Sequence, residues 1–469
     1  MNLSVPIRDR GRLDPKNSLR RQQLLLILTG LTLVAFAAVD VRYLGAIFND
    51  SMRWLLLALL LVVLLIRGAI GSGTGGVLGA LIAAYCIWVL SSVSWSLVPA
   101  LSLPKAIVAV LVIFVFTGAG FEWVRRVGER HALTLFAPLS ALALLVALVG
   151  SSLPEATIDT GSVVIYSGLA YNPNLLGILI IMALPWAMST YDASRQGKMR
   201  KRLFSYLLLA TLLAALFFTG ARASILAVAL AIATYVLCVG FGRNMTIAAV
   251  GVLVASAVLT AFPGMIGSLW EIMQKGAGEG GDIFLSRRET WGQSLAGAEQ
   301  GGWFGLGYGV SAGHANFEGG FTAAGYGREK GNSALAVIEE LGVVGFALYL
   351  SMLAGVLRTL ISAALRAQSR EARGSLAIAA GTILGLIANS QFEAWWTAPG
   401  APASPFFWTL VGVSIRMAET QKRNSSQRPP VSSTAAEISR RRRLHARLRQ
   451  KAWERKIKNV SPSSGVRRR

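Results

Sequence analysis

Five basic side chains in the polar stretches of this 469-residue chain are candidates for binding a phosphate group. Arg222 begins an apolar run, and Arg287, Arg288, Arg328 and Lys330 lie in one long polar segment. A guanidinium presents five N–H donors in a rigid fork, so it can hold a phosphate through two parallel hydrogen bonds. At a membrane surface these cations together would enclose the diphosphate of a lipid head group.

The same cations also have structural explanations. An arginine at the end of a membrane span can extend its side chain to the lipid head groups without binding a specific ligand. The segment that holds the other cations also contains Asp282, Glu289 and Glu329, which could form ordinary ion pairs with them.

Few residues could accept a proton in such a site. The chain has three histidines, and only His314 shares the polar segment with the cations. Glu340 and its neighbour Glu339 lie in the apolar run that follows, where acids usually face protein or water. The alternatives are a surface histidine at 314 and a glutamate at 340 that pairs with an arginine of the segment.

Aromatic residues of the same segment, such as Trp291 and Tyr308, offer a surface on which a sugar could stack. Their alternative role is packing within the segment or anchoring at the membrane interface. We expect the pair Trp395 and Trp396 to be interfacial anchors.

Several kinds of chemistry have no signature in the sequence. It contains no glycine-rich phosphate-binding loop of the ATPase type, no His, Cys and acid cluster with metal-ligand spacing, and no Asp-x-Asp. We therefore expect neither cofactor nor metal, and a substrate that arrives already activated on a lipid.

The elements that must position these residues are apolar. A helix of about 17–25 residues crosses the hydrocarbon core of a bilayer. Stretches of this kind predict an all-α polytopic integral membrane protein with about twelve transmembrane helices. The expected spans are 22–39, 54–66, 76–93, 104–120, 132–150, 172–190, 204–219, 223–241, 246–263, 333–354, 375–391 and 404–418.

The net charge of +23 is explained by topology. Most of the 46 Lys and Arg residues fall in segments that are cytoplasmic if both termini are cytoplasmic, as the positive-inside rule requires. We therefore expect no nucleic-acid partner. The first apolar run has the outline of a signal peptide, but we expect it to be retained as a helix.

Three regions follow from this topology. Residues 1–21 form a basic cytoplasmic N-terminus, and residues 22–418 form the helix bundle, which includes a large periplasmic loop at 263–332. Residues 419–469 form a basic cytoplasmic tail. This tail either lies on anionic lipid or is solvated.

The motifs resemble those of the bacterial O-antigen ligase and O-antigen polymerase superfamily. The resemblance covers about 166–350, and the motifs share one order and one expected side of the membrane. The matching segments are Tyr171-Asn-Pro-Asn174, Arg222-Ala-Ser-Ile-Leu226, Arg287-Arg-Glu289-Thr-Trp291, Gly305-Leu-Gly307-Tyr-Gly309, and Asn332 followed after nine residues by Gly342-Val-Val-Gly345.

This resemblance implies a GT-C-like, metal-independent membrane glycosyltransferase in the bacterial inner membrane, with a periplasmic active site. It implies a glycan on undecaprenyl diphosphate as donor. The acceptor would be lipid A-core for a ligase, or a second lipid-linked repeat unit for a polymerase of O-antigen or exopolysaccharide. It also implies that Asn174 and Asn332 position the glycan or the acceptor.

One departure from the family pattern concerns its proposed base. The motif histidine of the family falls on Gly331, which has no side chain. His314 or Glu340 could replace it, with Glu339 as a neighbour of the latter, or the good leaving group could make a strong base unnecessary. The departure slightly favours a polymerase over a ligase. The alternatives are a non-catalytic subunit and a transporter or flippase of lipid-linked glycans.

Overall fold

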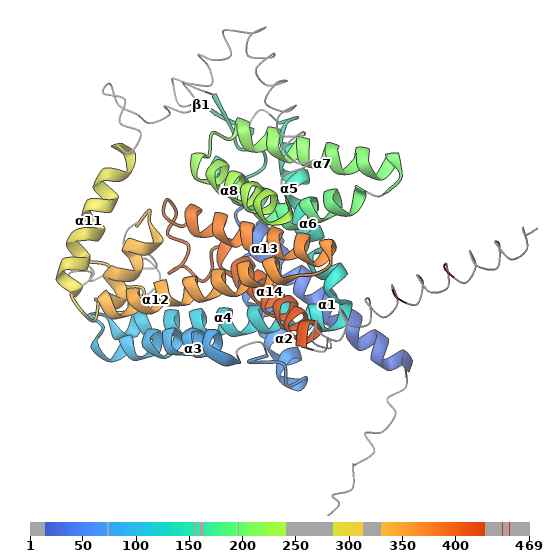
Figure 1. The fold of residues 1–469 in the computed structure, drawn as a ribbon. Helices are drawn as coiled ribbons and strands as arrows, with labels where there is room; N and C mark the ends of the chain where they lie inside the picture. Colours follow the sequence, from blue (N-terminus) through green and yellow to red (C-terminus); the bar gives the residue numbers. More distant parts are fainter. Residues whose placement is uncertain are drawn as a thin grey trace, which may run out of the picture. The chain divides into compact units, whose positions relative to one another are not determined.

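A computed structural model of the chain describes residues 15–72, 75–153, 156–159, 164–195, 197–240, 285–312 and 330–426, together with Arg443 and Gln450. The chain divides into two compact units, Met1–Glu419 and Thr420–Arg469. The first unit holds the helices that build the site, and they are described below (Figure 1).

The described part is almost entirely helical, and this confirms the predicted all-α class. Its elements, in chain order, are α1 (Pro15–Ala38), α2 (Asp50–Ile66), α3 (Gly76–Ser91), the 3₁₀ helix η1 (Ser92–Trp95), α4 (Pro99–Val127), the 3₁₀ helix η2 (Glu129–Phe136), α5 (Ala137–Gly150), β1 (Thr157–Asp159), β2 (Val164–Tyr166), α6 (Pro173–Ser194), α7 (Met199–Phe218), α8 (Arg222–Val239), α11 (Leu285–Gly301), α12 (Ser333–Arg366), α13 (Arg370–Asn389) and α14 (Ala403–Ser426). The two strands form one antiparallel hairpin.

Eight helical segments in the described part are long and apolar enough to cross a membrane. They are Gly76–Trp95, Pro99–Val127, Glu129–Gly150, Pro173–Ser194, Met199–Phe218, Arg222–Val239, Ser333–Arg366 and Arg370–Asn389. Three more of the predicted spans correspond to α1, α2 and α14, which are helical but do not meet the same length and composition. The predicted span at 246–263 lies outside the described residues.

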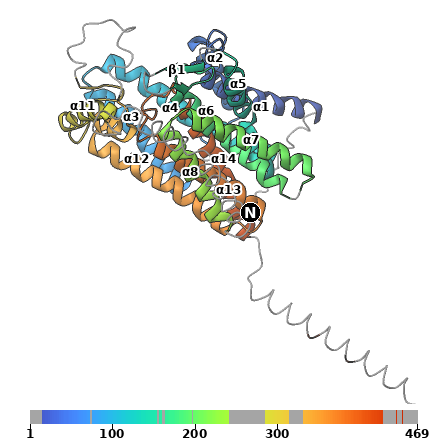
Figure 2. The same cartoon turned by 90° about the horizontal axis from the view of Figure 1, so that it is seen from above.

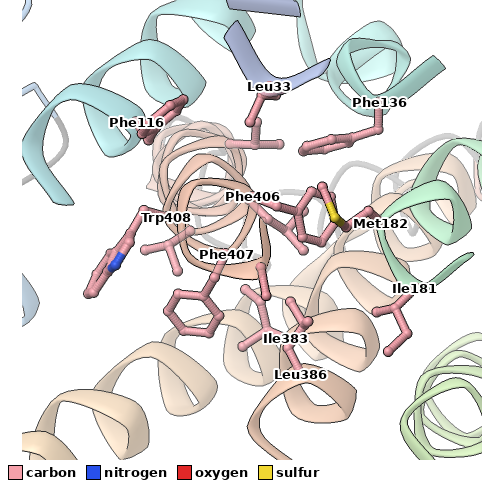
Figure 3. Packing of buried hydrophobic residues seen from close by; sticks show 14 of the residues in the cluster. Leu33, Phe116, Phe136, Ile181, Met182, Ile383, Leu386, Phe406, Phe407 and Trp408 are labelled. Carbon is pink, nitrogen blue, oxygen red and sulfur yellow. The ribbon is translucent and has the colours of Figure 1, made fainter. Parts of the chain in front are cut away.

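The first part of α14 lies at the centre of the hydrophobic core. Phe406 and Phe407 are fully buried, and the rings of Phe406 and Phe136 meet edge to face with their centroids 5.0 Å apart. Figure 3 shows the side chains that surround them, from α1, α4, η2, α6 and α13: Leu33, Phe116, Phe136, Met182, Ile383 and Leu386.

Small residues let α4 and α14 cross at close range. A Cβ atom at Gly120 would collide with the carbonyl oxygen of Thr409, and one at Gly412 with that of Thr117. Such contacts bring helix backbones close enough for dispersion forces to hold them together inside a membrane. The close crossing fixes α4, which carries one wall of the site described below.

Four helix ends meet at one end of the bundle. The first turns of α6 and α8 touch, because a Cβ atom at Gly177 would lie 2.6 Å from Oγ of Ser224. Ser333 at the start of α12 donates its N–H to the carbonyl oxygen of Ser390, just after α13 (2.8 Å). Figures 1 and 2 also show α11 beside the first part of α12. The residues between these helix ends therefore come together from distant parts of the sequence.

Two asparagines fix where these helices begin. Asn172 accepts a hydrogen bond from the N–H of Leu175 (2.8 Å), and Asn332 accepts one from the N–H of Leu335 (3.0 Å). Each side chain satisfies an N–H group that the first helical turn leaves without a partner. The starts of α6 and α12 are thus fixed by the asparagine that stands directly before each helix.

Candidate active site

The site is built around a break in α12. Gly342 has φ 69° and ψ −171°, which are not helical angles, and the helix is interrupted there. The break releases the carbonyl oxygens of Glu339 and Glu340 from the helical pattern. They accept hydrogen bonds from the N–H groups of Leu306 and Gly307, each at 3.0 Å.

The turn that docks on this break is the predicted Gly-x-Gly-x-Gly segment. Gly305, Gly307 and Gly309 all have positive φ, between 76° and 103°, a region that only glycine enters without steric cost. A Cβ atom at Gly305 would also collide with the backbone of Glu340. The glycines are therefore needed for the turn to lie directly on α12.

The turn and α12 hold a buried cluster of three charges. Nζ of Lys330 lies 2.5 Å from Oε1 of Glu340 and 3.6 Å from Oε2 of Glu339. Oε2 of Glu340 accepts the N–H of Gly309 at 2.6 Å, and Oε1 of Glu339 accepts that of Ala312 at 2.9 Å. The exposed fractions of Lys330, Glu339 and Glu340 are 7%, 0% and 2%. The two acids thus hold both the lysine and the glycine turn in place.

A second lysine reaches the same turn from α4. Nζ of Lys105 donates to the carbonyl oxygen of Gly309 at 3.0 Å, and Lys330 donates to that of Val310 at 3.2 Å. The two ammonium groups therefore bind successive carbonyls of one turn. Lys105 was not among the predicted site residues. In the sequence, Lys105 stands out only as a cation on the expected outer side, directly after Pro104 in an otherwise apolar run.

A cavity of about 660 Å³ opens beside these lysines. Its walls come from the turn after α1, from α2, from the N-terminal parts of α4 and α6, from the glycine turn, from Lys330 and the first part of α12, and from the loop between α13 and α14. The lining residues are Asp40, Arg53, Trp54, Leu101, Pro104, Lys105, Val108, Asn172, Asn174, Leu175, Ile178, Gly309, Lys330, Glu340, Glu393, Ala394, Trp395, Thr397, Ala398, Pro399, Gly400, Ala401 and Pro402. The wall is thus mostly apolar, with charged groups at a few places.

The loop between α13 and α14 contributes a carboxylate to the cavity. Oε1 of Glu393 accepts a hydrogen bond from Nδ2 of Asn174, at 3.0 Å. Its backbone carbonyl accepts one from Oγ of Ser333 at 2.8 Å, and Oγ of Ser333 in turn accepts the N–H of Trp396 at 3.2 Å. Residues of α6, α12 and this loop are therefore joined at one point.

Asp40 and Arg53 contribute opposite charges to another part of the wall. Arg53 donates to the carbonyl oxygen of Gly400 at 3.0 Å and pairs with Asp50 at 2.5 Å. Burial raises the pKa of Asp40 above its usual range, because the cost of desolvation outweighs the attraction of Arg53, and nearby Asp50 adds to the rise.

Three of the predicted site residues line the cavity: Lys330, Glu340 and Asn174. Two more lie next to it. Asn332 caps α12, and Trp291 donates its indole N–H to the carbonyl oxygen of Gly331 at 3.3 Å. The structure thus brings together residues that are more than 150 positions apart in the chain.

The other predicted residues have different positions. Tyr308 is 1% exposed and lies in the hydrophobic core, with its N–H donated to Oγ of Ser92 at 3.1 Å. Arg222 begins α8 and is not among the described residues that line the cavity. Arg287 and Arg288 belong to α11, but their side chains, and the whole of His314 and Arg328, lie outside the described part.

The predicted interfacial role of Trp395 and Trp396 is wrong. Their exposed fractions are 4% and 6%, and they pack in an aromatic cluster with Phe407 and Trp408. The indole N–H of Trp396 donates to the hydroxyl of Tyr85 at 2.9 Å, and that of Trp395 to the side chain of Asn389 at 3.2 Å. These buried hydrogen bonds anchor the loop that carries Glu393.

Gly331 stands at the position on which the motif histidine falls, and its backbone has a left-handed conformation, with φ 62°. It lies between Lys330, which forms the buried ion pair, and Asn332, which caps α12. The backbone of this segment is thus held from both sides, while its central residue carries no group that could act on a proton.

The described residues contain no group of three or more His, Cys, Asp or Glu side chains arranged to hold a metal ion. The charged and amide side chains that line the cavity are the two lysines, Arg53, the three carboxylates and the two asparagines. The wall of the cavity is mostly apolar, and Lys105 and Lys330, the latter paired with Glu340, bring ammonium groups to it that can bind an anionic group.

Comparison with known proteins gives a family for the central region. One chain in a solved structure, described as "Structural coordination of polymerization and crosslinking by a peptidoglycan synthase complex", is similar with 17% identity and a TM-score of 0.40, covering 73% of this chain and 97% of that one. No curated protein matches. Residues 207–350 match the model of the family Wzy_C, described as O-antigen ligase, and this confirms the predicted resemblance of the chain to the O-antigen ligase and polymerase superfamily.

Proposed function

We propose that this membrane protein transfers a glycan from a polyprenyl diphosphate, such as undecaprenyl diphosphate, to a hydroxyl group of an acceptor. The acceptor is a second lipid-linked repeat unit in the polymerase form of the proposal and lipid A-core in the ligase form. The reaction occurs on the periplasmic face of the bacterial inner membrane. The family match to residues 207–350 supports the reaction type.

The single observation that supports this proposal most is the pair Lys105 and Lys330 beside an apolar cavity. Their ammonium groups are fixed on the carbonyls of Gly309 and Val310, and both side chains line the cavity. Cavities of roughly 300–1,000 Å³ hold small ligands, and this one has about 660 Å³. It is large enough for a diphosphate with the first sugar and the first isoprene units.

The lysines suit the chemistry of the leaving group. Transfer breaks the bond between the anomeric carbon and the diphosphate, and negative charge grows on the departing oxygen. Fixed cations in a site that excludes water stabilise this charge without having to reorganise. Glu340 fixes one of these cations, since it binds Lys330 through Oε1 while Oε2 holds the glycine turn.

Other cations complete the proposed head-group site. Arg222 begins α8, whose next turn touches the first turn of α6 through Ser224 and Gly177. The start of α8 thus lies beside the part of α6 that lines the cavity with Asn174, Leu175 and Ile178. We assign Arg222, with Arg287, Arg288 and Arg328, to the outer part of the diphosphate or to the sugar beyond it. Asn174, Asn332 and Trp291 position the glycan or the acceptor.

The proposal is tested with purified protein in nanodiscs and undecaprenyl-diphosphate glycan from the source cell, without added metal or nucleotide. A ladder of lipid-linked repeats on a gel indicates a polymerase, the form that Gly331 slightly favours. Transfer that begins only when lipid A-core is added indicates a ligase. If neither product forms while the lipid still binds, the transferase proposal fails and a transporter or a non-catalytic subunit remains.

A further inference from the structure

We propose that Glu393 is the general base of this transfer and takes the place of the histidine that Gly331 lacks. The inference rests on the proposed glycosyl transfer and deepens it, because it names the group that receives the proton of the acceptor hydroxyl. Glu393 lies outside the family's motifs and outside the matched region 207–350.

The first argument is the position of Glu393 beside the start of α12. Oγ of Ser333 binds the carbonyl oxygen of Glu393 at 2.8 Å, and the N–H of Ser333 binds that of Ser390 at 2.8 Å. Ser333 follows Gly331 by two residues. The loop between α13 and α14, which carries Glu393, is thus fastened at two places to Ser333, close in the chain to the position on which the motif histidine falls.

The second argument is the orientation of the carboxylate. Glu393 lines the cavity that Lys105 and Lys330 also line. Nδ2 of Asn174 donates to Oε1 of Glu393 at 3.0 Å, from the first turn of α6. A side-chain amide at this place fixes the plane of the carboxylate. Asn174 was expected to position the glycan or the acceptor. In this proposal it does so indirectly, because it holds the carboxylate of Glu393.

The third argument concerns the hydrogen bonds and charged neighbours of the other carboxylates that line the cavity. Both oxygens of Glu340 accept hydrogen bonds that the fold requires, one from Lys330 and one from the N–H of Gly309. Asp40 lies on the turn after α1, and Arg53 and Asp50 are its charged neighbours. Glu393 is joined to the start of α12 through its backbone, because its carbonyl oxygen accepts a hydrogen bond from Oγ of Ser333.

The step can be written with all atoms accounted for. The acceptor oxygen forms a bond to the anomeric carbon of the donor, and its proton moves to Glu393. The bond from that carbon to the diphosphate breaks, and its electron pair leaves with the polyprenyl diphosphate, whose charge Lys105 and Lys330 offset. The proton on Glu393 is released to water before the next transfer, so no oxidant or further reactant is needed.

The test compares Glu393→Gln, Glu393→Asp and Asp40→Asn with the wild type in the nanodisc assay, over a range of pH. We expect Glu393→Gln to lower kcat by roughly 10²–10⁴-fold, the usual contribution of a general base, and to leave KM for the donor within a few-fold. We expect Glu393→Asp to retain a larger part of the rate. Glu371→Gln, in an exposed ion pair with Arg130, is the control and should behave as wild type.

The pH profile separates a base from a structural residue. The wild-type rate should rise with pH as one carboxylic acid loses its proton, and this rise should vanish in Glu393→Gln. The other charged groups that line the cavity are Asp40, Arg53, Lys105, Lys330 and Glu340, and they are unchanged in this variant.

Three results would overturn the inference. The first is a Glu393→Gln variant with a rate within a few-fold of wild type, or with a lower rate but an unchanged profile. The second is loss of the pH dependence in Asp40→Asn instead, which would assign the base to Asp40. The third is a wild-type protein that binds the donor and transfers nothing, which would remove the proposed function and this inference together.

Discussion

The ammonium group of Lys330 lies 2.5 Å from Oε1 of Glu340, and both side chains are almost completely buried. The two residues are ten positions apart, on either side of the start of α12. The pair joins the segment before α12 to the turn at Gly309, because Glu340 binds both. This relationship makes Lys330 both a structural residue and a cation of the cavity.

The first prediction concerns this pair. Lys330→Ala leaves Glu339 and Glu340 buried without their cation, and we expect it to lower the free energy of unfolding by about 3–5 kcal/mol. Thermal unfolding in detergent measures the change. Lys330→Met combined with Glu339→Gln and Glu340→Gln removes all three charges of the buried cluster, so it should recover much of the stability but remain inactive. An unchanged melting temperature in Lys330→Ala would contradict a buried ion pair.

The second prediction concerns the glycine turn. Gly305→Ala places a Cβ atom against the backbone of Glu340, in addition to the strain of φ 81°, so we expect a large loss of thermal stability and of activity. Gly302→Ala is the matched control. Its φ is 56°, but no atom lies within 4 Å of the added Cβ, so only the backbone strain remains. Equal losses in the two variants would show that the turn does not dock on α12.

The third prediction concerns the arginines of the motifs. We expect Arg222→Ala to abolish transfer while membrane expression stays at the wild-type level, because the variant loses charge stabilisation of the leaving diphosphate. Arg287→Ala should weaken transfer severely. Blotting of the membrane fraction together with the product ladder measures both quantities. Normal product from both variants would remove the arginines from the head-group site.

The fourth prediction uses the raised pKa of Asp40. A carboxyl whose pKa is higher in the folded protein than in the unfolded chain favours folding in its protonated form. Its contribution is fully present below the unfolded pKa of about 3.9 and is lost as the pH rises through the folded pKa. We therefore expect Asp40→Asn to unfold at a higher temperature than wild type at pH 7, with a smaller difference at pH 4. A destabilised Asp40→Asn at pH 7 would contradict this sign.

Much of the fold follows from the sequence, because hydrophobic length decides which segments can cross a bilayer. The expected spans at 76–93, 104–120, 172–190 and 204–219 correspond to α3, α4, α6 and α7. The starts of α6 and α12 could also be predicted from the sequence, because Asn172 and Asn332 stand just before apolar runs and asparagine is a favoured N-cap residue. The break in α12 could not be predicted from the sequence, because the non-helical angles of Gly342 depend on the glycine turn that packs against it.

The site could be predicted only in part, because its residues meet through packing. Lys330, Glu340 and Asn174 carried motif signals and do line the cavity. Lys105 and Glu393 belong to no motif, and nothing local in the sequence indicates that they face the same cavity. Trp395 and Trp396 followed the pattern of interfacial residues, but their N–H groups have partners inside the bundle at Asn389 and Tyr85, which sequence spacing does not indicate.

The central claim is that the cavity beside Lys105 and Lys330 binds the lipid diphosphate. Photoaffinity labelling tests it directly, with an undecaprenyl diphosphate that carries a diazirine on the isoprene units next to the diphosphate. Mass spectrometry then maps the labelled peptides of the purified protein.

We expect adducts in the first turns of α4 or α6, around Leu101, Val108, Leu175 and Ile178, which line the apolar wall. Unlabelled undecaprenyl diphosphate should compete for them, and Lys105→Met should reduce them by roughly 10–100-fold at limiting probe. This follows from a charged hydrogen bond worth about 1.5–3 kcal/mol. Labelling confined to other helices, or labelling at these turns that neither the competitor nor Lys105→Met lowers, would contradict the account.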